Sequence, residues 1–137
     1  MSAMQRRKGI GAELEVAGII RDCTGWDVRR KVRQHAADSD LEGIPGWQPE
    51  VKRHKTASRA EIASWWLQTV AQATQALPVL FYRADRADWR AVWPLEVVLA
   101  AQWSAAGLWA DIDWTADTTV EAWAAVARDL VTQEVPR

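Results

Sequence analysis

Two acidic residues and a lysine stand close together near the middle of the chain, around a Pro-Gly turn. They are Asp40, Glu50 and Lys52 in the segment DLEGIPGWQPEVKR. In a strand, side chains two residues apart share a face, so Glu50 and Lys52 point the same way and Val51 points toward the core. Asp40 is expected across the turn, at the start of a partner strand. Carboxylate oxygens gathered in this way suit a hard cation such as Mg²⁺, which activates water and neutralises charge on a phosphate.

A third carboxylate, Glu13, belongs to a predicted N-terminal helix and is expected to close the site from the other side. Lys52 is expected to orient a water or stabilise the transition state of phosphate chemistry. The pattern Glu-x-Lys alone is weak evidence, because ion pairs on an exposed strand face have the same spacing. The segment is thus either a hairpin with a charged outer face or a metal-dependent nuclease centre, and only the combination of residues favours the second.

The elements that must position these residues follow from apolar spacing. Apolar residues at helical spacing predict helices, and alternating or continuous apolar runs predict strands. One predicted helix has Ser58 as its cap, with Glu61 three residues later. The predicted helices are 9–23, 56–77 and 118–131, and the predicted strands are 26–34, 41–44, 47–54, 78–85, 88–100 and 108–114. For 88–100, a turn of helix at its end is the alternative to a strand throughout. The strand 41–44 is expected to return through the turn into 47–54 as a hairpin. This order predicts an α/β or α+β domain with a mixed sheet flanked by helices.

Composition narrows the class of protein. A chain of 137 residues with 49% hydrophobic residues fits a single folded domain. No apolar run is long enough for a membrane span, and the N-terminus leads into charge rather than a secretory signal. The single Cys23 excludes an intrachain disulfide and a cysteine-based zinc site, so we expect a cytoplasmic protein. The ten tryptophans are interpreted as core residues, with stacking platforms for bases as the alternative.

The net charge of −1 conceals an asymmetry along the chain. Twelve of the 17 Lys/Arg residues but only eight of the 18 Asp/Glu residues lie before residue 60. A nearly neutral total does not exclude nucleic acid as a partner, because binding depends on where the cations lie. The cations near the proposed centre are expected to contact phosphates: Arg6, Arg7, Lys8, Arg29, Lys31, Arg33, Arg53 and Lys55.

Three segments together resemble the PD-(D/E)XK nuclease superfamily, and within it the Holliday-junction-resolvase-like branch that is common in phages. They are RRKGIGAELE, DLEGIPGWQPEVKR and WWLQTVAQATQALPVLFYRADRADWRAVWP. The resemblance covers about residues 6–94, so it implies a restriction-endonuclease-like core over 1–94 and leaves 95–137 as a C-terminal appendage with the terminal helix. Two positions depart from the pattern: Ser39 replaces the proline that names the motif, and Ile10 stands where resolvases often have a serine.

The resemblance implies roles for individual residues. Glu13, Asp40, Glu50 and the backbone carbonyl of Val51 would ligate Mg²⁺, for which Mn²⁺ is expected to substitute, and Lys52 would be the catalytic lysine. A glutamine on the second helix often supports such a site, and the choice between Gln68 and Gln72 stays open.

The resemblance also implies a function: cleavage of DNA, in particular of four-way junctions, by a homodimer in the cytoplasm of a bacterial host. The alternatives are a DNA-binding module with the same fold but no catalysis, and a nuclease with flap, mismatch or restriction-type substrates. The amphipathic helix 118–131 and the Trp-rich strands are both candidates for the dimer surface. For the helix, the alternative is that it covers an open face of its own sheet.

Overall fold

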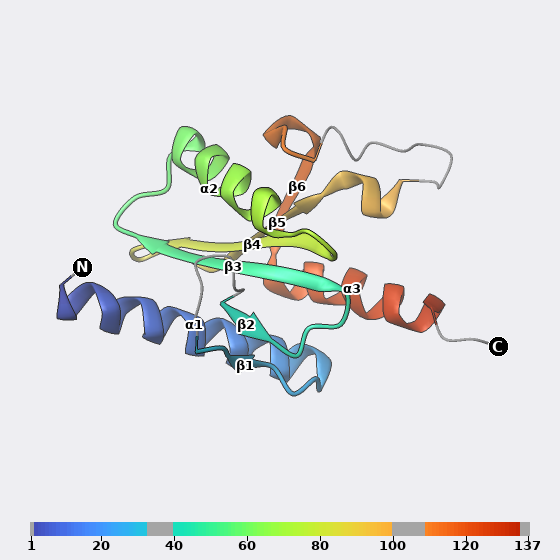
Figure 1. Ribbon diagram of the computed structural model, residues 1–137, viewed down its shortest axis with the longest axis horizontal. Helices are drawn as coiled ribbons and strands as arrows, with labels where there is room; N and C mark the ends of the chain where they lie inside the picture. The colour runs from blue at the N-terminus through green and yellow to red at the C-terminus, as the bar shows by residue number, and fades with distance from the viewer. Residues whose placement is uncertain (1, 33–39, 100–108, 135–137) are drawn as a thin grey trace.

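The protein is a mixed α/β fold in which helices cover both faces of one sheet (Figure 1). The computed structural model describes residues 2–32, 40–99 and 109–134. The elements in chain order are α1 (Ala3–Thr24), β1 (Arg29–Arg30), β2 (Leu41–Glu42), β3 (Trp47–His54), α2 (Arg59–Gln72), β4 (Leu77–Ala84), β5 (Arg90–Pro94), η1 (Leu95–Val98), η3 (Ile112–Trp114), β6 (Thr115–Thr119) and α3 (Val120–Glu134).

The main sheet has the strand order β3-β4-β5-β6. β3 and β4 are parallel and are joined by α2, whereas β5 runs antiparallel to both β4 and β6. Figure 1 shows α2 on one face of this sheet and α1 and α3 on the other. A mixed sheet flanked by helices confirms the predicted fold class and is consistent with a restriction-endonuclease-like core.

The helices α1 and α2 both begin with a capping box. Ser2 and Gln5 cap α1, so this helix begins at Ala3 rather than near Gly9 as predicted. Ser58 and Glu61 cap α2, which confirms the predicted start signal. α2 ends at Gln72, earlier than predicted, because the chain from residue 77 onward belongs to β4.

The predicted strand 26–34 is wrong over most of its described length. Only Arg29 and Arg30 pair as a strand, antiparallel to β2. The N–H of Val28 donates to the carbonyl of Trp26, so the chain is still turning as it leaves α1, which ends at a left-handed Gly25. Apolar and polar residues alternate here because Val28 is buried in the core. Burying that side chain does not require the segment to pair with another strand along its whole length. Residues 33 and 34 lie outside the described residues.

The predicted hairpin between residues 41–44 and 47–54 is also wrong. β2 pairs with β1, and β3 pairs with β4 over all eight of its residues. Gly43 and Gly46 adopt positive φ angles of 95° and 83°, which turn the chain out of β2 and into a different sheet. A side chain at Gly43 would not fit, because its Cβ would lie 2.3 Å from the carbonyl oxygen of Asp27.

The segment before the last helix differs from its prediction in a similar way. Residues 112–114 form the 3₁₀ turn η3 rather than a strand, since the Asp111 carboxylate accepts the N–H of Asp113 and closes the turn. The strand follows as β6, which takes Thr118 and Thr119 from the predicted helix, so that α3 begins at Val120. The remaining residue of the predicted strand, 108, lies outside the described part.

The main core lies between the sheet and the helices α1 and α3. Trp123 of α3 is fully buried there and packs edge-on against Phe81 and Trp47, with ring centroids 4.9 Å and 5.5 Å away. Five of the described tryptophans are buried, which favours the core interpretation for those residues: Trp47, Trp66, Trp89, Trp93 and Trp123. The apolar stripe of α3 is thus used inside the chain's own core.

We predict that replacing Trp123 with alanine lowers the free energy of unfolding by about 3–5 kcal/mol, because a large buried ring is lost and a cavity is left. Chemical denaturation followed by circular dichroism measures this change. The control is Trp114→Ala, since that ring is 37% exposed and its loss leaves no buried cavity. Equal losses in the two variants would contradict the central role of Trp123.

Candidate active site

Glu50 and Lys52 lie together on β3, an outer strand of the described sheet. Val51 lies opposite Phe81 and packs into the main core, whereas Glu50 and Lys52 lie opposite Leu80 and Tyr82 on the face that α2 covers. The Nζ of Lys52 is 3.5 Å from an oxygen of Glu50. The alternation predicted from the sequence therefore places the two side chains on one face.

Asp40 reaches β3 although the predicted hairpin does not form. Its Oδ2 accepts a 2.7 Å hydrogen bond from the N–H of Val51, and its carbonyl accepts the N–H of Lys31 at 3.0 Å. The residue is 2% exposed. The N–H and C=O of one strand residue point to the same side of the strand. The carbonyl of Val51 is therefore on the same outer edge as the Asp40 carboxylate.

The site holds carboxylates in a setting where charge is costly. Glu50 is 3% exposed, and its near neighbour Lys52 keeps only 22% of its side chain in contact with solvent. Burial of an ionised carboxylate is unfavourable unless a partner charge or hydrogen bonds compensate it. Such buried charges are more frequent at functional sites than elsewhere, which distinguishes this cluster from a solvated strand face.

Glu13 comes from α1 and is ion-paired with an arginine that the sequence analysis did not single out. Its Oε2 is 2.9 Å from Nε of Arg30, and the side chains are 17% and 29% exposed. The sequence contained one signal for Arg30: the alternation of residues 26–33 placed this cation in the same row as the apolar Trp26 and Val28. A cation in an inward-facing row needs a partner inside the protein.

These residues line one cavity of about 380 Å³ at the edge of the sheet, between α1 and α2. Gln68 of α2 lines it too, whereas Gln72 lies outside the lining, which favours Gln68 as the supporting glutamine. The lining comprises Gln5, Arg6, Gly9, Ile10, Glu13, Arg30, Lys31, Val32, Asp40, Glu50, Val51, Lys52 and Gln68.

The donor atoms of this cavity fit a hard cation through two carboxylates rather than three. Among the described residues, no three His, Cys, Asp or Glu side chains come close enough together to hold a metal ion. Mg²⁺ binds through one or two carboxylates and completes its shell with water and substrate phosphate. Asp40 and Glu50 are two buried carboxylates of one cavity, next to the Val51 carbonyl edge, and this set satisfies that requirement.

The cations expected to contact DNA differ in their surroundings. Lys8 and Arg53 both pair with Asp85, at 3.1 Å and 3.6 Å, and the hydrogen bond from Lys8 lowers the pKa of that carboxyl. Arg29 pairs with Asp27 at 2.8 Å. The remaining described candidates are Arg6 and Lys31 in the cavity lining, and Arg7 and Lys55 on the exposed surface. Arg33 lies outside the described residues.

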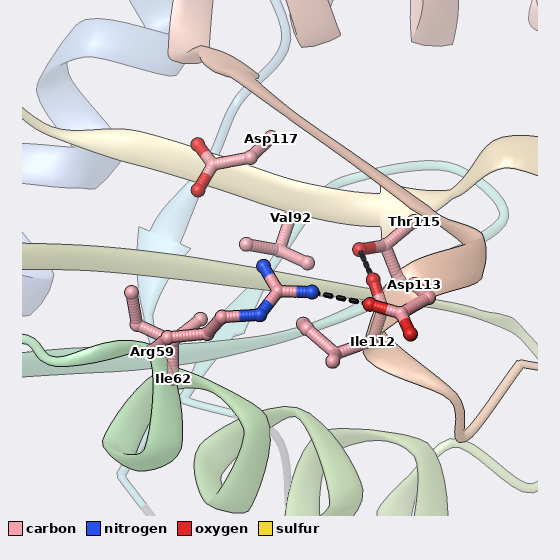
Figure 2. Close-up of a pocket in the computed structure, with 7 residues that line it drawn as sticks. All are labelled: Arg59, Ile62, Val92, Ile112, Asp113, Thr115 and Asp117. Carbon is pink, nitrogen blue, oxygen red and sulfur yellow. Dashed lines mark hydrogen bonds and ion pairs between the residues drawn. The ribbon is translucent and has the colours of Figure 1, made fainter.

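A second cavity, of about 310 Å³, lies on the α2 face toward β6 and away from β3 (Figure 2). Its charged groups pair with one another: Arg59 with Asp113, and Asp117 with Arg90. Asp117 also accepts a 2.6 Å hydrogen bond from the hydroxyl of Tyr82, and burial raises the pKa of that phenol. The cavity contains none of the residues expected to do chemistry.

We predict that Asp40→Ala destabilises the protein by about 1–3 kcal/mol, because the N–H of Val51 loses its acceptor at a buried position. Asp40→Asn is the matched variant, since its amide oxygen can accept the same hydrogen bond, and we expect it to unfold close to the wild-type midpoint. Thermal and urea denaturation measure both. Equal stability of Asp40→Ala and wild type would show that the bond to Val51 contributes nothing.

No helix in the described ranges is both long and apolar enough to cross a membrane.

Comparison with known proteins places the chain in a family. Searches of the curated proteins and of the solved structures give no match. The family model described as "phage putative PDDEXK endonuclease" matches residues 4–127, which run from the start of α1 into α3. The match includes every residue that lines the cavity on the β3 edge. Because the family model spans nearly the whole chain, the protein belongs to this phage PD-(D/E)XK endonuclease family.

Proposed function

We propose that the protein is a divalent-metal-dependent DNA endonuclease whose active centre is the cavity on the β3 edge. One observation carries this proposal. Two buried carboxylates, Asp40 and Glu50, share a solvent-accessible cavity with Lys52 in a chain of an endonuclease family. If the segment were only the charged outer face of a hairpin, which is the alternative to a nuclease centre, these carboxylates would be exposed to solvent.

The residues proposed to hold the metal ion are Asp40, Glu50 and the carbonyl of Val51. Glu13 was expected as a further ligand, and its pairing with Arg30 points to another role, argued below. When bound there, Mg²⁺ or Mn²⁺ would lower the pKa of a water and neutralise charge on the phosphate. The hydrogen bond from the N–H of Val51 fixes the Asp40 carboxylate relative to β3, so that the donors keep their arrangement when substrate arrives.

Lys52 is proposed to act on the reacting phosphate. Hydrolysis adds a water oxygen to phosphorus and breaks one P–O ester bond, which leaves a phosphate monoester and a hydroxyl. Negative charge builds up on the phosphate oxygens during this step, and an ammonium group nearby stabilises it. Glu50 lies 3.5 Å from the ammonium and so holds it within the cavity that both residues line. Gln68 lines the same cavity and is proposed to hold water or substrate by its amide.

The proposed substrate is branched DNA, with four-way junctions as the first choice. The support is the resemblance to junction-resolving nucleases over residues 6–94. Flap, mismatch and restriction-type substrates remain the alternatives within the same chemistry. The alternative without cleavage chemistry is a DNA-binding module that does not catalyse. The two buried carboxylates disfavour such a module, because binding of phosphates alone needs cations and not buried anions.

We predict that Glu50→Gln abolishes metal-dependent cleavage, by at least about 100-fold in kcat, while DNA binding persists. The variant should still fold, because the amide has the shape of the carboxylate and the Lys52 side chain left without its partner charge keeps 22% of its surface in contact with solvent. Glu42→Gln is the matched control: Glu42 is an exposed glutamate on β2 outside the cavity lining, and its loss should leave cleavage unchanged.

The measurement uses labelled four-way junctions, duplexes, flaps and single strands with Mg²⁺, with Mn²⁺ and with EDTA. Cleavage that requires a divalent ion and disappears in Glu50→Gln supports the proposed centre, and the preferred DNA identifies the substrate. Wild-type rates for Glu50→Gln would rule out this site, and cleavage in EDTA would rule out the metal requirement.

Several described cations are proposed to guide DNA to the centre. Arg6 and Lys31 line the cavity, and Arg7 and Lys55 lie exposed in the same basic half of the chain. Lys8, Arg29 and Arg53 already pair with carboxylates of the chain, so their contribution to phosphate binding is expected to be smaller than that of the first four. The basic half of the chain therefore acts mainly through the cations around the cavity.

The protein is further proposed to act as a homodimer. A four-way junction presents two equivalent strands, and a two-fold symmetric pair of chains would place one centre on each. We predict the mass of a dimer by light scattering at micromolar concentration, and paired symmetric nicks in the junction. A monomeric mass both alone and on the junction, together with symmetric nicks, would contradict a preformed dimer.

A further inference from the structure

The cavity on the β3 edge contains one charged pair that the proposed chemistry does not use, namely Glu13 and Arg30. Glu13 extends from α1 and Arg30 from the short strand β1, and the two charged groups approach to 2.9 Å. Both residues line the cavity that holds Asp40 and Glu50. Arg30 keeps 29% of its side chain in contact with solvent, more than Glu13 with 17%. The arginine is therefore the more accessible member of the pair.

The charge of the lining favours an anionic occupant. Among the described residues, three acidic side chains line the cavity, and four cationic ones oppose them: Arg6, Arg30, Lys31 and Lys52. Lys52 is close to Glu50, and Arg30 is close to Glu13. A guanidinium carries five N–H donors in a planar fork, and a carboxylate engages at most two of them. Arg30 can therefore hold Glu13 and a second anion at once.

We propose that Arg30 is a phosphate-binding residue of the active centre and that Glu13 positions its guanidinium. This inference rests on the proposed function, because it takes a DNA phosphate as the second anion. It gives Glu13 a role through Arg30 and not as a third metal ligand, in line with a cavity whose buried carboxylates are Asp40 and Glu50. Arg30 binds the phosphate to be cleaved or its neighbour on the same strand.

A purely structural role is the competing explanation, in which the pair only fastens β1 to α1. The contacting atoms, Nε of Arg30 and Oε2 of Glu13, are buried, but a purely structural role does not account for the 29% of the Arg30 side chain that stays in contact with solvent. β1 is also held by its pairing with β2 and by the N–H of Lys31 bound to the Asp40 carbonyl. β1 therefore has attachments besides this pair, and fastening β1 to α1 is not the only role open to it.

The first experiment measures DNA binding without cleavage. Fluorescence anisotropy in EDTA gives the affinity of wild type and of Arg30→Gln for a labelled junction and a duplex over a range of salt concentrations. We expect Arg30→Gln to weaken binding about 5- to 20-fold and to reduce the salt slope by about 1, with an unchanged melting temperature. Arg59→Gln is the control, because Arg59 pairs with Asp113 at the second cavity, and it should keep wild-type affinity and slope.

A double-mutant cycle separates positioning by Glu13 from metal ligation. Removing a carboxylate near DNA should by itself strengthen binding in EDTA, through lost repulsion. If Glu13 positions Arg30, Glu13→Gln weakens or fails to strengthen binding in the wild-type background and strengthens it in the Arg30→Gln background. The same strengthening in both backgrounds would overturn the positioning role.

The outcomes for Arg30 also distinguish the inference from the proposed function. Wild-type protein that neither binds nor cleaves any DNA would defeat the proposed function. Wild-type protein that binds and cleaves while Arg30→Gln keeps its affinity and salt slope would defeat the inference alone. If Arg30→Gln does not fold, Arg30→Lys decides: a retained slope with weaker binding supports the forked contact, and wild-type affinity overturns it.

Discussion

The hydrogen bond between the Asp40 carboxylate and the N–H of Val51 is the contact on which the proposed centre depends. β3 has β4 on one side, so the backbone groups on its other side need partners from outside the main sheet. Asp40 supplies one, and because it directly precedes β2, this contact also fixes the small β1 and β2 sheet against the edge of β3. One buried carboxylate therefore closes the edge of the sheet and forms part of the cavity.

The edge of β3 explains why the cavity lies here and not elsewhere on the sheet. An outer strand must be covered to prevent unwanted pairing. In this chain the cover is partial: α1 and the two short strands approach from one side and α2 from the other, and the cavity is the space between them. Gly43 makes this arrangement possible, since its positive φ and its close contact with Asp27 let the chain turn from β2 toward β3. The partial cover that protects the edge of β3 therefore leaves a cavity through which a ligand can reach Glu50 and Lys52.

Local signals in the sequence predicted the parts of the fold that depend on neighbours along the chain. The capping box at Ser58, the central strand β4 and the shared face of Glu50 and Lys52 all follow from spacing within a few residues. Strand partners do not, because an alternating pattern specifies which side chains are buried and not which strand lies alongside. For this reason β2 was assigned to β3 instead of β1, and the pairing of Arg30 with Glu13, which joins two distant elements, could not be predicted at all.

The distribution of ion pairs limits where a polyanion is attracted. Glu15 and Asp85 pair with Arg53, Glu15 also pairs with Arg83, and Asp85 with Lys8, so the cations beside β3 and β4 on the α1 side are balanced by carboxylates of the chain. In the cavity on the β3 edge, four cations exceed three carboxylates among the lining residues that the structure describes. A chain with a net charge of −1 can therefore still present a local positive potential, because the field near a cleft depends on the charges that line it and not on their total.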